Sequence, residues 1–232
     1  MSENQLAVKM LAGVEFHYRP GTIDEMVIDE DYGTTRFLAP GYKPGLADTI
    51  VDAGAHIGAF TVRVAQLVPA GRVHAIEAAR ENIDVLDTNI TANRLSNVAV
   101  HHVALSGRVS SPTTLLYHCT QSWGHSLGGG GSTPSGEVEE VPAQTLDAFL
   151  SLNRIQRVDY LKMNIEGAEY DLLLGARREA LRRIQLMLVE LHPAADALAD
   201  ELTTWLRSCG FVCAIEEIDH PDVKGLMTVR QS

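Results

Sequence analysis

Residues 50–60, which read IVDAGAHIGAF, are the part of the chain whose residue types and spacing could most plainly do chemistry. An apolar run ends at Asp52, the chain turns at Gly54, and Gly58 stands where a helix begins. Glycine lets a backbone turn sharply and approach a ligand closely, because it has no side chain. The free amides at the start of a helix can bind polar ligand groups. The segment therefore predicts a ligand site between a buried strand and a helix.

Glu77 is the second candidate, because it ends another apolar run and lies 19 residues after Gly58. In doubly wound folds an acidic residue at the end of the second strand accepts hydrogen bonds from ribose hydroxyls. The glycine turn lacks the middle glycine of G-x-G-x-x-G, which lets a pyrophosphate approach the backbone. The pair favours a nucleoside-type ligand such as S-adenosylmethionine (SAM) over NAD. A tight turn that binds no ligand is the alternative.

The expected elements that position these residues alternate between strands and helices. Short apolar runs typical of strands occupy residues 49–53, 72–77, 98–105, 158–163, 184–191, 211–217 and 226–230. Apolar residues at helical spacing, such as Phe60 and Val64, follow most of them. This order predicts an α/β fold with a mostly parallel sheet of seven strands and helices on both faces. The short connection between the last two runs predicts a C-terminal antiparallel hairpin.

Two segments fall outside this alternation. Residues 1–48 are rich in turn formers and predict an N-terminal cap, with short strands or a helix, laid against a main domain at 49–232. Residues 106–144 contain a glycine run and predict a variable loop or hairpin. That loop could be a plain surface connection or a lid beside the active site.

Composition narrows the class of protein. A hydrophobic fraction of 45% allows a sizeable core, and a net charge of -11 disfavours nucleic-acid partners. No apolar run reaches the length of a membrane helix and the first residues lack a signal pattern, so we expect a cytoplasmic protein without a membrane partner. The three cysteines form no zinc set, and no metal site is predicted. We expect a small-molecule substrate, and a homodimer stays open.

Four segments together resemble the FkbM family of class I SAM-dependent methyltransferases. They are IVDAGAHIGAF at 50–60, AIEAARENIDVLDTNITAN at 75–93, LKMNIEGAEYDLLLGA at 161–176 and LMLVELHP at 186–193. SWGHSL at 122–127 is a weaker match. The resemblance implies a Rossmann-like class I methyltransferase fold, SAM as cofactor, and methyl transfer, commonly to a hydroxyl of a sugar or natural product.

The chain departs from the family pattern at two positions. Asn164 stands where the family has aspartate, and Ala78 stands where proline is common after the ribose-binding acid. An asparagine can form hydrogen bonds but cannot act as a carboxylate base or as a strong ligand of a hard metal. The departure therefore weakens any case for an essential metal.

We expect the cofactor contacts at the carboxyl ends of the strands. The predicted cofactor-binding residues are Asp52, Ala53, Gly54, Ala55, His56, Gly58, Glu77, Ala78, Asn82, Ala104, Leu105 and Asn164. Asp52 is expected to bind nearby amides or the amino group of the cofactor, and His56 to act through its backbone amide. Asn82 could instead cap a helix. Ala104 and Leu105 would flank the adenine ring.

Methyl transfer from a sulfonium requires donor and acceptor to be held in line, and a hydroxyl acceptor also requires a base. We predict that Glu166 and His192 lie near the acceptor and that one of them is the base, with Asn164 orienting cofactor or substrate. Glu169 fits better as a carboxylate at a helix start, and Glu190 could equally be buried and hydrogen-bonded. The loop residues His118 and His125 are weaker substrate-side candidates.

Four functions stay open from the sequence. The leading hypothesis is a small-molecule O-methyltransferase, and an N-methyltransferase acting on an amine is its nearest rival. An NAD-dependent oxidoreductase shares the fold, but the missing middle glycine counts against it. A SAM-binding module without catalysis is the fourth, and the asparagine at 164 keeps it open.

Overall fold

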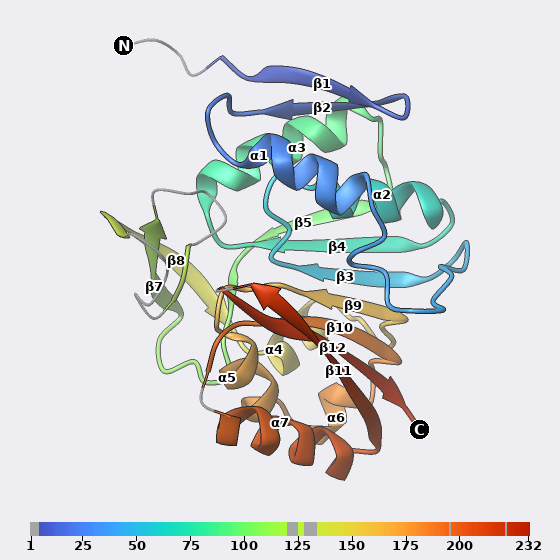
Figure 1. The fold of residues 1–232 in the computed structure, drawn as a ribbon, viewed down its shortest axis with the longest axis vertical. Coiled ribbons are helices and arrows are strands. Elements are labelled where there is room, and N and C mark those ends of the chain that lie inside the picture. The colour runs from blue at the N-terminus through green and yellow to red at the C-terminus, as the bar shows by residue number, and fades with distance from the viewer. Residues whose placement is uncertain (1–4, 120–124, 128–133, 195, 221) are drawn as a thin grey trace.

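A seven-stranded sheet forms the centre of the chain in the computed structural model, which describes residues 5–119, 125–127, 134–194, 196–220 and 222–232 (Figure 1). Across the sheet the strands are β11 (Phe211–His220), β12 (Val223–Gln231), β10 (Leu186–Leu191), β9 (Tyr160–Met163), β3 (Thr49–Ala53), β4 (Arg72–Glu77) and β5 (Val98–His102). The five strands from β10 to β5 are parallel, whereas β12 is antiparallel to both β10 and β11. The predicted fold class is confirmed.

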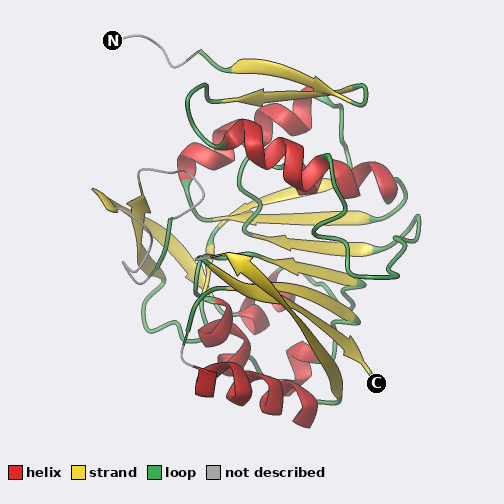
Figure 2. Cartoon of the chain, viewed as in Figure 1, coloured by secondary structure: helices red, strands yellow, loops and turns green. Residues whose placement is uncertain are grey.

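Helices cover both faces of this sheet (Figures 1 and 2). One face carries α2 (Ala59–Leu67) and α3 (Arg80–Ala92), and the other carries α4 (Leu146–Leu152), α5 (Glu169–Gly175), α6 (Arg178–Leu181) and α7 (Asp196–Ser208). The central strands are apolar throughout because both faces are buried, and all six residues of β10 are buried. Among the described residues, no helix has the length and apolar character needed to cross a membrane.

The N-terminal segment packs on α2 and α3. It contains the antiparallel strands β1 (Ala7–Leu11) and β2 (Val14–Tyr18), the helix α1 (Asp24–Val27) and one π-helical turn, η1 (Ile28–Tyr32). Phe16 and Ile28 are fully buried in a cluster with Ile57 and Val62. The segment therefore shares a core with the sheet domain, and its treatment as a separate cap stays a prediction.

The run at 98–105, expected as one strand, is divided by the structure. β5 ends at His102, and Ala104–Leu105 (β6) joins a second sheet with β8 (Pro134–Gln144) and β7 (Thr113–Cys119). The chain passes from the first sheet to the second at Val103. The Val103 amide still donates to the Glu77 carbonyl, whereas the next residue, Ala104, pairs with Ala143. The glycine run of the predicted lid lies outside the described residues, so the lid stays a prediction.

Candidate active site

The turn at Gly54 brings three strand ends together. The amides of Gly54 and Ala55 both donate to the Ile76 carbonyl, at 3.0 and 2.9 Å. Gly54 has φ +78°, and a Cβ there would lie 1.7 Å from the backbone oxygen of Asn164. No side chain fits in that space, so glycine is required both for the turn and for the close approach of β3 to the loop after β9.

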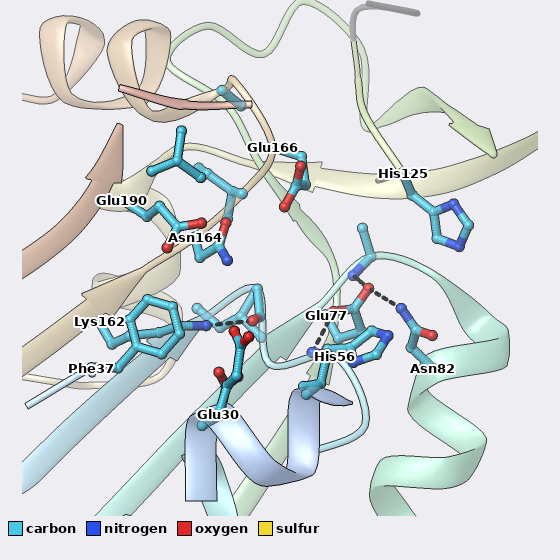
Figure 3. Close-up of a pocket in the computed structure, with 18 of the residues that line it drawn as sticks. Glu30, Phe37, His56, Glu77, Asn82, His125, Lys162, Asn164, Glu166 and Glu190 are labelled. Carbon is cyan, nitrogen blue, oxygen red and sulfur yellow. Dashed lines mark hydrogen bonds between the residues drawn. The ribbon is translucent and has the colours of Figure 1, made fainter. Parts of the chain in front are cut away.

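Glu77 is held at the end of β4 by four donors (Figure 3). Its Oε2 accepts the His56 amide at 2.8 Å, while Oε1 accepts the amides of Ala78 and Ala79 and the Nδ2 of Asn82. The backbone amide of His56 thus fixes this carboxylate, and its direct contact with a cofactor stays a prediction. Asn82 does not cap α3, because Ala79 holds the N-cap position. Among the described residues, Oε2 has the His56 amide as its one donor, so it can still accept a hydrogen bond from a ligand.

A cavity of about 600 Å³ opens at the carboxyl ends of the strands, next to Glu77. Eight predicted cofactor-binding residues line it, namely Gly54, His56, Glu77, Ala78, Asn82, Ala104, Leu105 and Asn164. Apolar side chains of Val103, Leu105, Leu116 and Leu127 surround the part near Glu77. An apolar slot beside a fixed carboxylate suits a flat ring attached to a sugar.

Four predicted cofactor residues lie behind this wall instead of on it, within the described part of the chain: Asp52, Ala53, Ala55 and Gly58. Asp52 is fully buried and accepts from the Thr61 hydroxyl at 2.6 Å, while its expected contact with nearby amides or with the amino group of the cofactor stays a prediction. A Cβ at Gly58 would lie 2.3 Å from Leu86 Cδ1, so this glycine serves the packing of α2 on α3. Direct contact of these four with a cofactor stays a prediction.

Lys162 is a functional residue that the sequence interpretation missed. Its ammonium is buried, donates to the Gly54 carbonyl at 2.6 Å, and lies 3.1 Å from Asp52 Oδ1. Burial alone would lower the pKa of Lys162, but Asp52 and Asp31 outweigh burial and raise it. The ammonium therefore stays charged and fixes the glycine turn from below. The sequence did contain a sign of this role, because a lysine within an apolar strand must be buried and therefore needs a partner for its charge.

The acceptor-side candidates meet as a chain of three ionisable groups. His192 Nε2 lies 3.2 Å from Glu166, and its Nδ1 lies 3.0 Å from Glu169. Glu169 is fully buried and also accepts the amides of Ile165 and Gly167, which agrees with its expected place at a helix start. Glu166 lines the cavity, whereas His192, among the residues described, stands behind it.

This arrangement separates the two candidate bases. Burial lowers the pKa of His192, but the carboxylates of Glu166 and Glu169 overcome that and raise it to about 11. The ring is therefore an imidazolium at neutral pH and has no lone pair with which to take a proton. Burial also raises the pKa of Glu166, against the effect of His192. The geometry favours Glu166 as the base and His192 as the residue that positions it.

The comparisons with known proteins agree with this site. A family model described as a methyltransferase FkbM domain matches residues 52–213, more than half of the chain. The chain belongs to this family. It is 29% identical to Methyltransferase 1 of Beauveria bassiana (strain ARSEF 2860), across 88% of this chain and 86% of that one. It is also 24% identical to the AMB antimetabolite synthetase AmbE of Pseudomonas aeruginosa, across 89% of this chain but 11% of the synthetase.

Solved structures of FkbM and other methyltransferases share the fold. The FkbM methyltransferase of Methylobacillus flagellatus KT aligns with a TM-score of 0.56 and 18% identity, over 85% of this chain and 47% of that one. Aeropyrum pernix fibrillarin, solved with natively bound SAM, aligns with a TM-score of 0.51 and 13% identity, over 97% and 82%. This FkbM chain is therefore a SAM-dependent methyltransferase, which sets aside the oxidoreductase alternative, and SAM is its expected cofactor.

The far end of the cavity in this FkbM protein holds charged residues that the sequence interpretation largely missed. They are Glu30, Asp31, Arg36, Glu190 and Asp219. Arg36 lies 2.6 Å from Glu30 and 2.8 Å from Glu190, so Glu190 is buried and paired, as one of its two interpretations had it. The first three residues come from the N-terminal segment, where no hydrophobic period marked a helix.

His125 also lines the cavity, whereas His118, in the described part of the chain, does not. Glu81, His118 and His125 each place a ligand atom within 4.8 Å of the others. However, His125 Nδ1 accepts the Cys119 amide at 3.0 Å, so its proton lies on Nε2, which faces Glu81 at 2.9 Å. A nitrogen that carries a proton has no lone pair for a metal, so this contact is a hydrogen bond from the loop after β7 to Glu81 of α3. Much of the weak match at 122–127 lies outside the described residues.

Proposed function

We propose that this FkbM methyltransferase transfers the methyl group of SAM to a hydroxyl group of a small molecule, a sugar or a natural product. The observation that carries the proposal is the Glu166 carboxylate on the cavity wall, beside the imidazolium of His192. A hydroxyl is a poor nucleophile until its proton is removed, and a positioned carboxylate can remove it. The name of one relative, an antimetabolite synthetase, supports a natural product as the substrate class.

The cavity residues fit the cofactor. Glu77 would accept hydrogen bonds from the ribose through Oε2, and Ala104 and Leu105 would flank the adenine. Asn164 would lie where the two substrates meet, because its side chain points into the cavity between Glu190 and Glu166 (Figure 3). Bound SAM supplies a methyl group that is already activated by its positive sulfur. The protein then needs only to hold the acceptor in line and take its proton.

The N-terminal segment would act as a cap over the acceptor. Ile23, Met26 and Val27 of this segment line the cavity. A cap of apolar side chains excludes water, which strengthens the interaction of Glu166 with a substrate hydroxyl.

Replacing Glu166 by glutamine is expected to lower kcat by roughly 10²- to 10⁴-fold, because glutamine cannot accept a proton. The affinity for SAM should change by less than about twofold, since Glu166 lies on the acceptor side. Methyl transfer to a panel of hydroxylated sugars and natural products, detected by mass, measures the first effect, and calorimetry measures the second. Glu201→Gln, an exposed change on α7, is the matched control. Equal turnover in both variants would remove Glu166 from the mechanism.

The pH profile gives an independent check. Since Glu166 must be ionised to act and its pKa is raised by burial, kcat/KM should increase with pH through a value above the ordinary glutamate range. In His192→Gln the imidazolium is lost, so the pKa of Glu166 rises further and the acidic limb moves to higher pH. A limb that stays in place, or moves to lower pH, would contradict the coupling of these two residues.

A further inference from the structure

The acceptor side of the cavity has more carboxylates than cations. This excess of negative charge indicates which class of substrate the cavity would bind, an inference that rests on the proposed function. The carboxylates are Glu30, Asp31, Glu166, Glu190 and Asp219, and the cations are Arg36 and Lys162. The apolar slot beside Glu77 has no such excess, because one carboxylate with four protein donors lies there. The excess is therefore confined to the part of the cavity beyond the expected adenosine.

The cations near this surface are already shared. Arg36 bridges Glu30 and Glu190 at 2.6 and 2.8 Å, so one positive charge faces two negative ones. His192 likewise lies between two carboxylates, and Lys162 is paired with Asp52 behind the wall. Neither Asp31 nor Asp219 forms an ion pair with any residue in the described ranges. Net negative charge therefore remains for a ligand to balance.

A second observation also calls for a donor. The Oδ1 of Asn164 is buried and accepts no hydrogen bond from the residues that the structure describes. A buried acceptor without a donor is costly, and native structures supply one from protein, water or ligand. Figure 3 shows this side chain pointing toward the space that Glu30 and Glu166 approach from opposite sides. The amide nitrogen faces that space, so a turn of the carboxamide about its last bond would present Oδ1 to a donor there.

We propose that the methyl acceptor is a small amino alcohol, bound through its ammonium group and methylated on its hydroxyl. The ammonium would be balanced by Glu30 and Asp31 and would donate to Asn164 Oδ1 once the carboxamide has turned, while the hydroxyl faces Glu166. The acceptor oxygen forms a bond to the methyl carbon, the carbon–sulfur bond of SAM breaks with its electrons left on sulfur, and the hydroxyl proton passes to Glu166.

The same charges explain why oxygen and not nitrogen would receive the methyl group. Carboxylates around an amine favour its charged form and raise its pKa. A protonated amine has no lone pair and cannot attack a methyl carbon. The acidic end would thus hold the amine as an anchor and leave the hydroxyl as the nucleophile, which counts against the N-methyltransferase alternative.

Asp31 provides a readout that a purely structural residue would not give. Desolvation raises the pKa of Asp31 to about 7, with Lys162 and Arg36 lowering it and Asp52 and Glu190 raising it. An added ammonium nearby would lower this pKa, so binding near neutral pH should release protons. Calorimetry in two buffers that differ in ionisation enthalpy measures that release.

SAM itself carries positive charge, and the experiment removes its sulfonium. Protein saturated with S-adenosylhomocysteine is titrated with trans-aminocyclohexanol, cyclohexanediol and hydroxycyclohexanecarboxylate, which share a ring and a hydroxyl but differ in charge. We expect the amine to bind at least about tenfold more tightly than the diol, and the acid to bind most weakly. In the double variant Glu30→Gln/Asp31→Asn this preference and the proton release should disappear, with the affinity for S-adenosylhomocysteine kept.

The matched control is Glu25→Gln/Asp29→Asn, which makes the same two changes on the outer side of the same segment, where both residues pair with Lys9. Its preference for the amine should equal that of the unchanged protein. Equal binding of the diol, tighter binding of the acid, absence of amine binding, or a preference that survives in the cavity variant would overturn the proposal. If the amine binds as expected but SAM yields no O-methylated product, the proposed function fails and the ligand class stands.

Discussion

Gly54→Ala is expected to lower the free energy of unfolding by more than about 3 kcal/mol and to abolish SAM binding. The added Cβ would lie 1.7 Å from the Asn164 oxygen and 2.8 Å from its carbonyl carbon, and both are backbone atoms that no rotamer change can move. Relief would require β3 to separate from the β9 loop, which forms the floor of the cavity. Denaturant unfolding and calorimetry with SAM measure the two losses.

Gly210→Ala separates this clash from backbone strain. Gly210 also has a positive φ, +95°, but a Cβ there would have no heavy atom within 4 Å. Its replacement should therefore cost only the left-handed backbone penalty, about 1–2 kcal/mol, and should leave cofactor binding intact. If Gly54→Ala cost no more than Gly210→Ala, the tight contact between the two strand ends would not be needed.

Glu77→Gln is expected to weaken SAM binding by roughly 2–4 kcal/mol, or about 30- to 1,000-fold in Kd. The amide keeps one acceptor oxygen for the amides of Ala78 and Ala79, but its NH₂ group then faces the His56 N–H, which is another donor. The variant loses both the charge and the acceptor that would hold the ribose. Titration calorimetry with SAM and S-adenosylhomocysteine measures the loss, and both ligands should be affected equally because they share the ribose.

Asp87→Asn is the control for Glu77→Gln, since it removes a carboxylate from the exposed face of α3. Its Kd for SAM should stay within about twofold of the unchanged protein. An unaltered Kd in Glu77→Gln would mean that the adenosine lies elsewhere. The assignment of the apolar end to the cofactor and of the acidic end to the acceptor would then be wrong.

The core of the fold could be predicted from the sequence because its signals are local. β3 and β4 were expected at 49–53 and 72–77 and lie at Thr49–Ala53 and Arg72–Glu77, since strands buried on both faces read as unbroken apolar runs. Gly54 directly follows the first run and Glu77 ends the second, so their place at the cavity could be predicted from the order of the elements. The fold and the cofactor were accessible for that reason.

Other features depend on contacts between distant segments. Nothing local in 98–105 shows that its last residues leave the central sheet, because the partner strand lies some 40 residues later. The charge of His192 depends on Glu166, in the loop after β9, and on Glu169, at the start of α5, and both meet it only in the folded chain. The composition of a segment does not show contacts with distant segments, so the choice between Glu166 and His192 as the base required the structure.

The acidic end of the cavity is the largest part that the sequence interpretation missed. Glu30 and Asp31 lie in a π-helical turn, whose spacing differs from that of the amphipathic helices that periodicity detects. Asp219 lies in the hairpin at the other end of the chain. Short irregular elements carry no pattern of their own, and only packing brings them to one surface.

The walls of this cavity also differ in their relation to the family. Gly54, Glu77 and Asn164 fall within residues 52–213, the span that the FkbM description matches, whereas Glu30, Asp31 and Asp219 fall before or after it. The residues proposed to hold SAM thus come from the matched span, whereas three of the carboxylates proposed to face the second substrate come from the segments on either side of it. An exchange of those two flanking segments with a relative would therefore change the proposed acidic surface while keeping Gly54, Glu77 and Asn164.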